Sequence, residues 1–168
     1  MEFEKVIYER ESVRMFNKNK PSEEQLMKIL EAGRRAPTAK NVQPQKIFVL
    51  DSVEALKKMD EVHRCRYKAK LVLLVCVDKE QVISVNGRSE CDIDGSIVAT
   101  HMMLEAYNLG VDSVWCGIFN PNEVRKVFGI AEKYEPICFL DLGFRSKLYP
   151  GSIWHKKRKP IEETYEKL

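Results

Sequence analysis

Residues 71–77, LVLLVCV, form a continuous apolar run, and this run constrains the fold more than any other segment of the chain. A strand with one side in water alternates apolar and polar residues, whereas an unbroken apolar run is typical of a strand covered on both faces. The run is too short to cross a bilayer, which takes about 20 residues in a helix. The chain must therefore supply helices for both faces of a sheet, and its 168 residues can bury such a core in one domain.

Caps, turns and hydrophobic periodicity divide the rest of the chain into interspersed helices and strands. We expect helices over 2–9, from a cap at Ser22 to near Pro37, after a cap at Ser52, over 92–109, over about 120–127 and over 161–168. We expect strands over 46–51, 71–77, 113–119 and 137–144. Segment 92–109 is apolar nearly all round, which places it in the core or at a subunit interface, and Gly110 ends it. This order indicates an α/β or α+β sandwich.

Charge and cysteine content exclude several classes of protein. The net charge is only +3, which argues against a dedicated nucleic-acid-coating protein. The five cysteines include no CxxC pair and no His/Cys cluster, so a zinc site is not expected, and reduced thiols in the cytosol fit better than a disulfide framework. The N-terminus is charged and lacks the apolar core of a signal peptide. We expect a soluble, cytoplasmic protein that contacts neither membrane nor nucleic acid.

Two arginines and a serine near the N-terminus raise the question of an anion site. Arg10, Ser12 and Arg14 lie within one turn of a possible helix, and guanidinium groups pair with phosphate oxygens in a two-pronged geometry. The alternative is a solvated helix end in which Glu11 neutralises an arginine. Neither common phosphate-binding loop, GxGxxG or GxxxxGK[ST], occurs in the chain, so any nucleotide must be held another way.

Three further segments could bind a ligand, and each has a plain structural alternative. In 36–44, APTAKNVQP, two prolines fix an extended loop that carries a hydroxyl and two amides, which could recognise a flat heterocycle or simply bond their own backbone. In 113–117, SVWCG, a glycine could allow close approach to a flat ligand, or the segment could be a core strand. The tail 155–160, HKKRKP, could contact nucleic acid or only aid solubility.

Taken in order, these segments resemble the nitroreductase family of flavin enzymes, most closely its short members. That family carries RxSxR after its first helix and then A-P-[ST]-x-x-N-x-Q-P, and these two motifs are the specific part of the resemblance. The corresponding segments here span essentially the whole chain: ERESVR, APTAKNVQP, HMMLEAYNLG, GVDSVWCG and KKRKPIEE. The chain departs from the family at Glu11, where a second arginine is usual, and at His101, where asparagine is common.

The resemblance implies an α+β fold, a nitroreductase-like α/β sandwich whose central, mostly antiparallel sheet is flanked by helices. It implies one domain over 1–168 and a C-terminal extension, from about 146, that wraps the partner subunit. It also implies a homodimer that holds FMN at the subunit interface, with part of the 37–43 loop supplied by the neighbouring subunit. The cofactor-binding residues implied in this way are Arg10, Glu11 (through its backbone), Ser12, Arg14, Pro37, Thr38, Ala39, Asn41, Gln43, Trp115, Cys116, Gly117, Lys157 and Arg158, with Lys156 an alternative to Lys157.

The activity implied by the resemblance is hydride transfer from NAD(P)H through FMN to a nitroaromatic, a quinone or a similar planar small molecule. No side chain need act as an acid or nucleophile, and Arg14 is the residue expected to stabilise the reduced flavin. Cys116 could be a redox thiol, but no resolving partner is near it in the sequence. The alternatives are a flavin enzyme of the same fold with dehalogenase or oxygen-consuming chemistry, a flavin-binding regulatory module, and a nucleic-acid binder that uses the basic tail.

Overall fold

The computed structural model describes residues 2–85 and 88–168, and its centre is a four-stranded sheet. The strand order is β1 (Gln45–Leu50), β2 (Leu71–Asp78), β6 (Tyr134–Gly143) and β5 (Asp112–Cys116). All three strand pairings are antiparallel, so the predicted α+β class with an antiparallel sheet is confirmed. The apolar run predicted to be covered on both faces is β2, every residue of which is buried.

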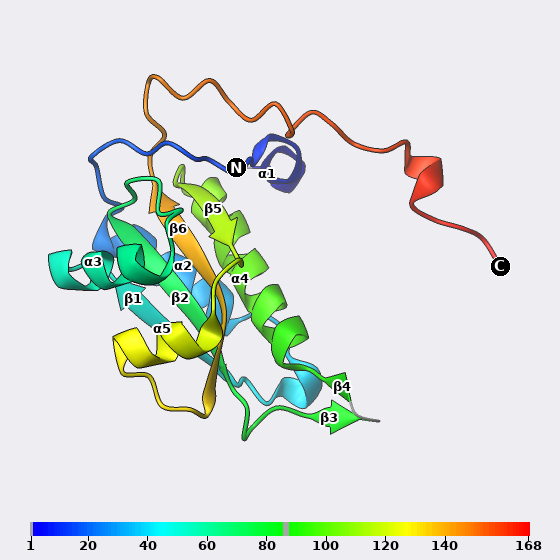
Figure 1. Ribbon diagram of the computed structural model, residues 1–168. Helices are drawn as coiled ribbons and strands as arrows, with labels where there is room; N and C mark the ends of the chain where they lie inside the picture. Colours follow the sequence, from blue (N-terminus) through cyan, green and yellow to red (C-terminus); the bar gives the residue numbers. More distant parts are fainter. Residues whose placement is uncertain (1, 86–87) are drawn as a thin grey trace.

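Helices cover both faces of this sheet (Figure 1). On one face, α2 (Glu23–Arg34) and α4 (Cys91–Asn108) pack over Leu71, Leu73 and Val75. On the other face, α3 (Val53–Val62) and α5 (Pro121–Phe128) cover the alternate residues of the same strand, including Val72 and Leu74. The short α1 (Phe3–Glu9) contacts α4. Successive side chains of β2 point to opposite faces of the sheet and thus contribute to two separate hydrophobic cores.

The helix ends lie close to the positions that capping residues in the sequence predict. The side chain of Ser22 caps α2 in a capping box with Gln25, and Ser52 and Asn120 cap α3 and α5. Gly110 follows α4 with a φ of +75°, in the left-handed region that glycine enters without steric cost. The side chains of these caps satisfy backbone N–H groups that the helices leave unpaired.

Several elements differ from the sequence-based expectation. β5 ends at Cys116 and not at 119, and β6 begins at Tyr134 because Pro136 is accommodated beside a bulge at Val75/Cys76. A small hairpin, β3 (Ser84–Val85) with β4 (Arg88–Ser89), was not predicted. The helix expected over 161–168 is wrong: only the 3₁₀ turn η2 (Ile161–Glu163) forms there.

Residues 146–168 leave the end of β6, run past α1 and extend away from the body of the protein (Figure 1). Residues 37–43 form a loop around the 3₁₀ turn η1 (Ala39–Asn41), which lies against the first turn of α4. Among the described helices, none combines the length and apolar character needed to cross a membrane.

Candidate cofactor site

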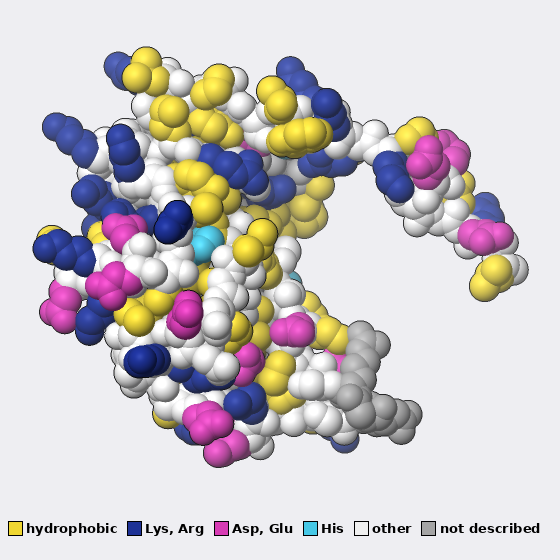
Figure 2. Space-filling view, in the orientation of Figure 1, with side chains coloured by type: hydrophobic (Ala, Val, Ile, Leu, Met, Phe, Trp, Pro, Cys, Tyr) yellow, Lys and Arg dark blue, Asp and Glu magenta, His cyan; other side chains and the backbone are white. Residues whose placement is uncertain are grey.

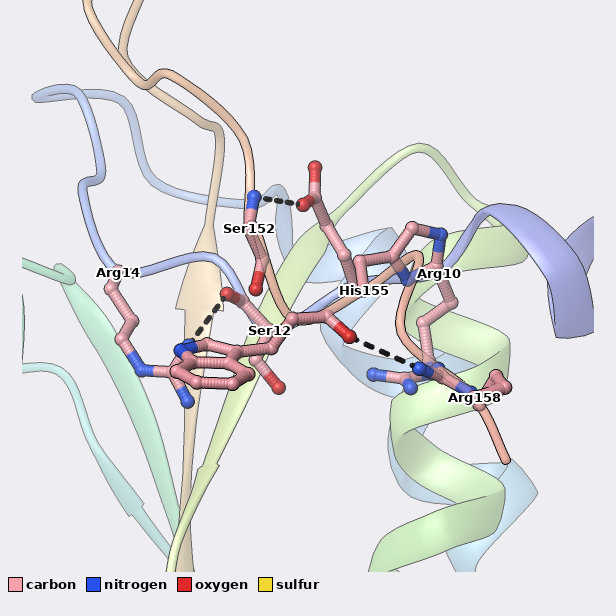
Figure 3. Close-up of a pocket in the computed structure, with 8 residues that line it drawn as sticks. Arg10, Ser12, Arg14, Ser152, His155 and Arg158 are labelled. Atoms are coloured by element: carbon pink, nitrogen blue, oxygen red, sulfur yellow. Dashed lines mark hydrogen bonds between the residues drawn. The ribbon is translucent and has the colours of Figure 1, made fainter.

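The segment that joins α1 to the sheet forms one wall of a hollow of about 190 Å³, which we call the cationic hollow. The opposite wall comes from the C-terminal tail (Figure 3). The lining residues are Arg10, Glu11, Ser12, Arg14, Ser152, Trp154, His155 and Arg158. Four residues that the sequence singled out at the N-terminus therefore meet Arg158 from the far end of the chain.

The guanidinium groups of Arg10 and Arg158 lie side by side in this hollow (Figure 3). Burial lowers the pKa of Arg10, the positive charge of Arg158 lowers it further, and the charge of Glu11 opposes both. Arg10 donates to the Sδ atom of Met103 at 3.7 Å, and Arg158 donates to the backbone oxygens of Trp154 and Lys157. Two adjacent cations held without a carboxylate between them are what a phosphate-binding site requires.

Glu11 turns its carboxylate away from these cations. Its Oε1 accepts a hydrogen bond from Arg145 Nη1 at 2.6 Å, and its Oε2 accepts from the backbone N–H of Ser152 at 2.7 Å. Arg145 also pairs with Asp112, and this hydrogen bond is the main cause of the raised pKa of Arg145. Arg145 therefore neutralises the negative charge of Glu11, the residue that departs from the family pattern. Through Ser152, Glu11 also holds the start of the tail in place.

A second hollow of about 170 Å³, the ring hollow, lies beside the end of β5 and shares Arg14 with the cationic hollow. Its other lining residues are His63, Cys65, Tyr67, Val114, Trp115, Cys116, Gly117 and Ile118. Trp115, Cys116 and Gly117, which the sequence analysis singled out as possible contacts of a flat ligand, thus line one hollow. Arg14 donates to the backbone oxygen of Ser12 at 3.4 Å, which orients it between the two hollows.

His63 is a feature of the ring hollow that the sequence analysis missed. The side chain is 7% exposed, stacks on Phe139 at a ring separation of 5.7 Å, and leaves its Nε2 without a partner among the described residues. Burial lowers its pKa, against a hydrogen bond with the backbone of Ile118, so the imidazole is neutral at pH 7. The sequence signal for His63 is only its place directly after α3.

Cys116 has the surroundings of a structural thiol and not of a redox centre. Its Sγ contacts the backbone oxygen of Cys65 at 3.6 Å and Asp141 Oδ2 at 3.9 Å. Burial raises the pKa of Cys116, and the nearby carboxyl of Asp141 raises it further, so the reactive thiolate is disfavoured. All five cysteines are free thiols.

The 37–43 loop and Lys157 lie outside both hollows. Ala39 N donates to Asp94 Oδ1 at 2.9 Å, which holds the loop at the first turn of α4, whereas Arg10 contacts Met103 near the last turns of the same helix. Lys157 Nζ lies 4.7 Å from the centre of the Trp154 ring. Within one chain, Pro37, Thr38, Ala39, Asn41 and Gln43 therefore do not meet the two arginines.

A model of the nitroreductase family matches residues 7–81 and 66–144 of this chain. The chain belongs to the nitroreductase family. A nitroreductase family protein from Clostridium difficile 630 is 38% identical, with a TM-score of 0.92 over 99% of this chain and 98% of that one. An Archaeoglobus fulgidus protein that carries the provisional name NADH dehydrogenase/NAD(P)H nitroreductase is 32% identical over 83% of both chains.

A third solved structure shares the fold at lower sequence identity. A protein from Exiguobacterium sibiricum, provisionally named a nitroreductase and solved in complex with FMN, has a TM-score of 0.87 over 100% of this chain and 98% of that one, at 20% identity, and so shows the common nitroreductase fold. The family identified from the sequence is confirmed by the matching model, and the enzyme class predicted with it agrees with the names of the curated relatives.

Proposed function

We propose that this nitroreductase-family chain is an FMN-dependent oxidoreductase that transfers hydride from NAD(P)H to a nitroaromatic, a quinone or a similar planar acceptor. The observation that carries the proposal is the meeting of Arg10 and Arg158, from opposite ends of the chain, at one hollow that opens beside a second hollow. A phosphate at the first and a flat ring at the second are the two ends of one flavin mononucleotide.

The residues present fit such a ligand. Arg10 and Arg158 would bind the phosphate, because a bound anion would offset both the burial and the neighbouring positive charge that lower the pKa of Arg10. The ring hollow offers the buried, unpartnered Nε2 of His63, which a polar edge of the ring would satisfy. When bound, FMN supplies the hydride-accepting and hydride-donating chemistry.

Arg14 has the charge and the place to favour the reduced state of the cofactor. It lines both hollows, so its guanidinium lies between the phosphate position and the ring position. A fixed cation there stabilises negative charge that develops on the ring during reduction. Trp115, Cys116 and Gly117 would exclude water from one face of the ring.

The remaining predicted residues fit a site shared by two copies of the chain. Phe3 and Tyr8 of α1 are 68% and 70% exposed, and α1, α2 and α4 enclose an apolar hollow of about 430 Å³ that includes Phe3, His101 and Leu104. A second copy packed on this face would cover these side chains. It would also bring its own 37–43 loop to the flavin, and its tail would wrap the first copy.

The experiment is reconstitution with FMN followed by anaerobic addition of NADH or NADPH. The proposal expects a protein whose oxidised flavin absorbance is bleached by at least one of the two nucleotides and restored by a quinone or nitroaromatic. A colourless protein that cannot retain FMN contradicts it, and so does bound FMN that neither nucleotide bleaches.

The phosphate assignment has its own test. Arg10→Ala and Arg158→Ala should each weaken FMN binding by about 1.5–3 kcal/mol, the size of a hydrogen bond to a charged group. Binding of riboflavin, which lacks the phosphate, should change little. Lys159→Ala is the matched control, because this tail cation pairs with Glu163 and does not line the cationic hollow. Equal losses in all three variants would contradict a shared phosphate site.

A further inference from the structure

A second group of cations surrounds a hollow that the proposed flavin site does not use. Phe16, Asn17 and Lys18 form one side of it, and Arg66, Lys68 and Lys70 form the other. We call this hollow, of about 300 Å³, the basic hollow. Lys and Arg side chains gather at the upper left of the face in Figure 2, where the N-terminal segment and the chain after α3 lie in Figure 1.

The floor and walls of the basic hollow are fixed by hydrogen bonds. Phe16 is buried, and its N–H donates to the backbone oxygen of Tyr67 at 3.2 Å. The N–H of Asn17 donates to Phe144 O at 2.8 Å, and Arg66 Nη1 donates to Ala69 O at 2.7 Å. The two sides therefore hold their positions without a ligand.

The turn that carries the lysines has an uncommon backbone. Tyr67 and Lys68 have φ values of +51° and +68°, and such left-handed residues cost on the order of 1–3 kcal/mol each when they are not glycine. Ala69 is fully buried, whereas Lys68 and Lys70 on either side of it are exposed and line the same hollow. Left-handed residues of this kind cluster at ligand clamps.

The charge of the basic hollow is not balanced by the protein. Arg66 is paired with Asp60 through bonds of 2.8 and 2.6 Å. Over residues 2–85 and 88–168, by contrast, Lys18, Lys68 and Lys70 make no ion pair. Three uncompensated ammonium groups around one hollow attract a ligand with several negative charges, and lysine binds phosphate as a point charge.

The same turn also lines the ring hollow, through Cys65 and Tyr67. Building on the function proposed above, we infer that the basic hollow binds phosphate groups of the reduced nicotinamide dinucleotide while its nicotinamide reaches the flavin in the ring hollow. A dinucleotide with an additional phosphate on its adenosine ribose gains most from three cations. The basic hollow therefore gives the enzyme a preference for NADPH over NADH.

The test compares Lys68→Ala/Lys70→Ala with the control Lys57→Ala/Lys126→Ala, which removes the same charge from exposed lysines outside the hollow. The FMN-loaded proteins are titrated calorimetrically with adenosine 2′,5′-bisphosphate at low salt, and KM is measured for both nucleotides. Loss of two cations should weaken bisphosphate binding about tenfold and raise KM for NADPH by a similar factor, with a smaller rise for NADH and little change in kcat. The control should match the wild type.

Two results would overturn the inference: equal bisphosphate binding in the variant and the control, or weakened binding with an unchanged ratio of the two KM values. The second result would make the hollow an anion site unconnected with the electron donor. A protein that oxidises neither nucleotide refutes the proposed function itself, whereas one that oxidises both with the same KM ratio in every variant refutes only the role of the basic hollow.

Discussion

The carboxylate of Glu11 joins two segments that are far apart in the chain. It is nearly buried, with its side chain 10% exposed, and it binds Arg145 after β6 and the backbone of Ser152 in the tail. Charge-assisted hydrogen bonds of this kind contribute about 1.5–3 kcal/mol each. Because Arg158 lies only six positions beyond Ser152, the orientation of Glu11 decides whether the tail cation reaches Arg10.

Glu11→Gln should therefore weaken the binding of FMN about tenfold, part of the energy of one charged hydrogen bond, with little effect on riboflavin. The affinity of Glu11→Asp for FMN should lie between that of the wild type and that of Glu11→Gln. Fluorescence titration with both flavins measures this difference. Glu9→Gln is the control, since Glu9 pairs with Lys5 at the surface. Equal losses for FMN and riboflavin would show that Glu11 acts through the fold and not through the tail.

Asp141 is a buried acid that the proposed site does not use. It is fully buried in β6, and its Oδ1 has no hydrogen-bond partner among the described residues. Burial holds the pKa of Asp141 well above its usual value, although the charge of Arg66 opposes this. The folded protein therefore keeps a proton that the unfolded chain releases near pH 4.

Because the folded state binds this extra proton, protonated Asp141 favours folding at low pH. This contribution to the free energy of unfolding is lost as the pH rises toward the pKa of Asp141 in the folded protein. Asp141→Asn should remove that loss. The free energy of unfolding of the variant should therefore rise relative to that of the wild type by up to about 1.4 kcal/mol per pH unit above pH 4. Urea unfolding at pH 5 and pH 8 measures the two slopes. Asp51→Asn at the surface is the control, and parallel slopes for Asp141→Asn and wild type would show that Asp141 is ionised in the fold.

At the scale of elements, the 37–43 loop is anchored at a buried carboxylate. Asp94, which is 2% exposed, accepts the N–H of Ala39, and the Thr38 hydroxyl accepts the N–H of Gln43. Lys40, Asn41 and Gln43 all have positive φ, so the loop is held in a conformation that these residues do not favour.

Asp94→Ala should release this loop and cost about 1–3 kcal/mol of stability, the usual effect of losing a buried hydrogen bond to a charged group. Affinity for FMN and for riboflavin should fall together, because the loop is proposed to contact the ring or its chain and not the phosphate. Hydrogen exchange over 38–43 should rise in the variant. Asp92→Ala, an exposed neighbour on the same turn, is the control, and unchanged exchange would contradict the anchoring role.

Elements with local signals were predictable and those fixed by distant partners were not. Ser22, Gly110 and Asn120 mark helix ends in the sequence itself, and the structure uses each of them. The end of β5 is set by strand pairing, since Cys116 is the last residue of β5 that pairs with β6. The residues that follow are also apolar, so the sequence does not indicate where the strand ends.

In the tail and in the site as well, features that depend on distant contacts could not be predicted from the sequence. The helix expected over 161–168 is absent because Ile161 and Tyr165 stay exposed beside the described part of the chain, and an isolated short helix is marginal in water. The anion motif was visible as Arg10 and Arg14, but the role of Glu11 depends on Arg145 and Ser152, which lie more than 130 positions away. His63 enters the site only through the packing of α3 on the sheet.

At the scale of the whole molecule, the two parts of the proposed site lie near opposite ends of α4. The 37–43 loop is tied to Asp94 and Arg10 contacts Met103, and these helix positions are about 13 Å apart along the axis. In the proposed dimer, a two-fold axis crossing α4 would set the first turn of one copy beside the last turns of the other. Each flavin would then receive arginines from one copy and the loop from its partner.

Leu104→Glu should therefore break the proposed dimer and release FMN together, because it places a charge in the apolar hollow between α1, α2 and α4. Val53→Glu on α3, on the opposite face of the sheet, is the matched control and should leave both unchanged. Sedimentation measured alongside flavin content tests the link, because a site completed by the partner loses flavin in proportion to the monomer formed. A Leu104→Glu monomer that keeps its full flavin content would mean that one chain closes the site alone, which the separation of the 37–43 loop from Arg10 argues against.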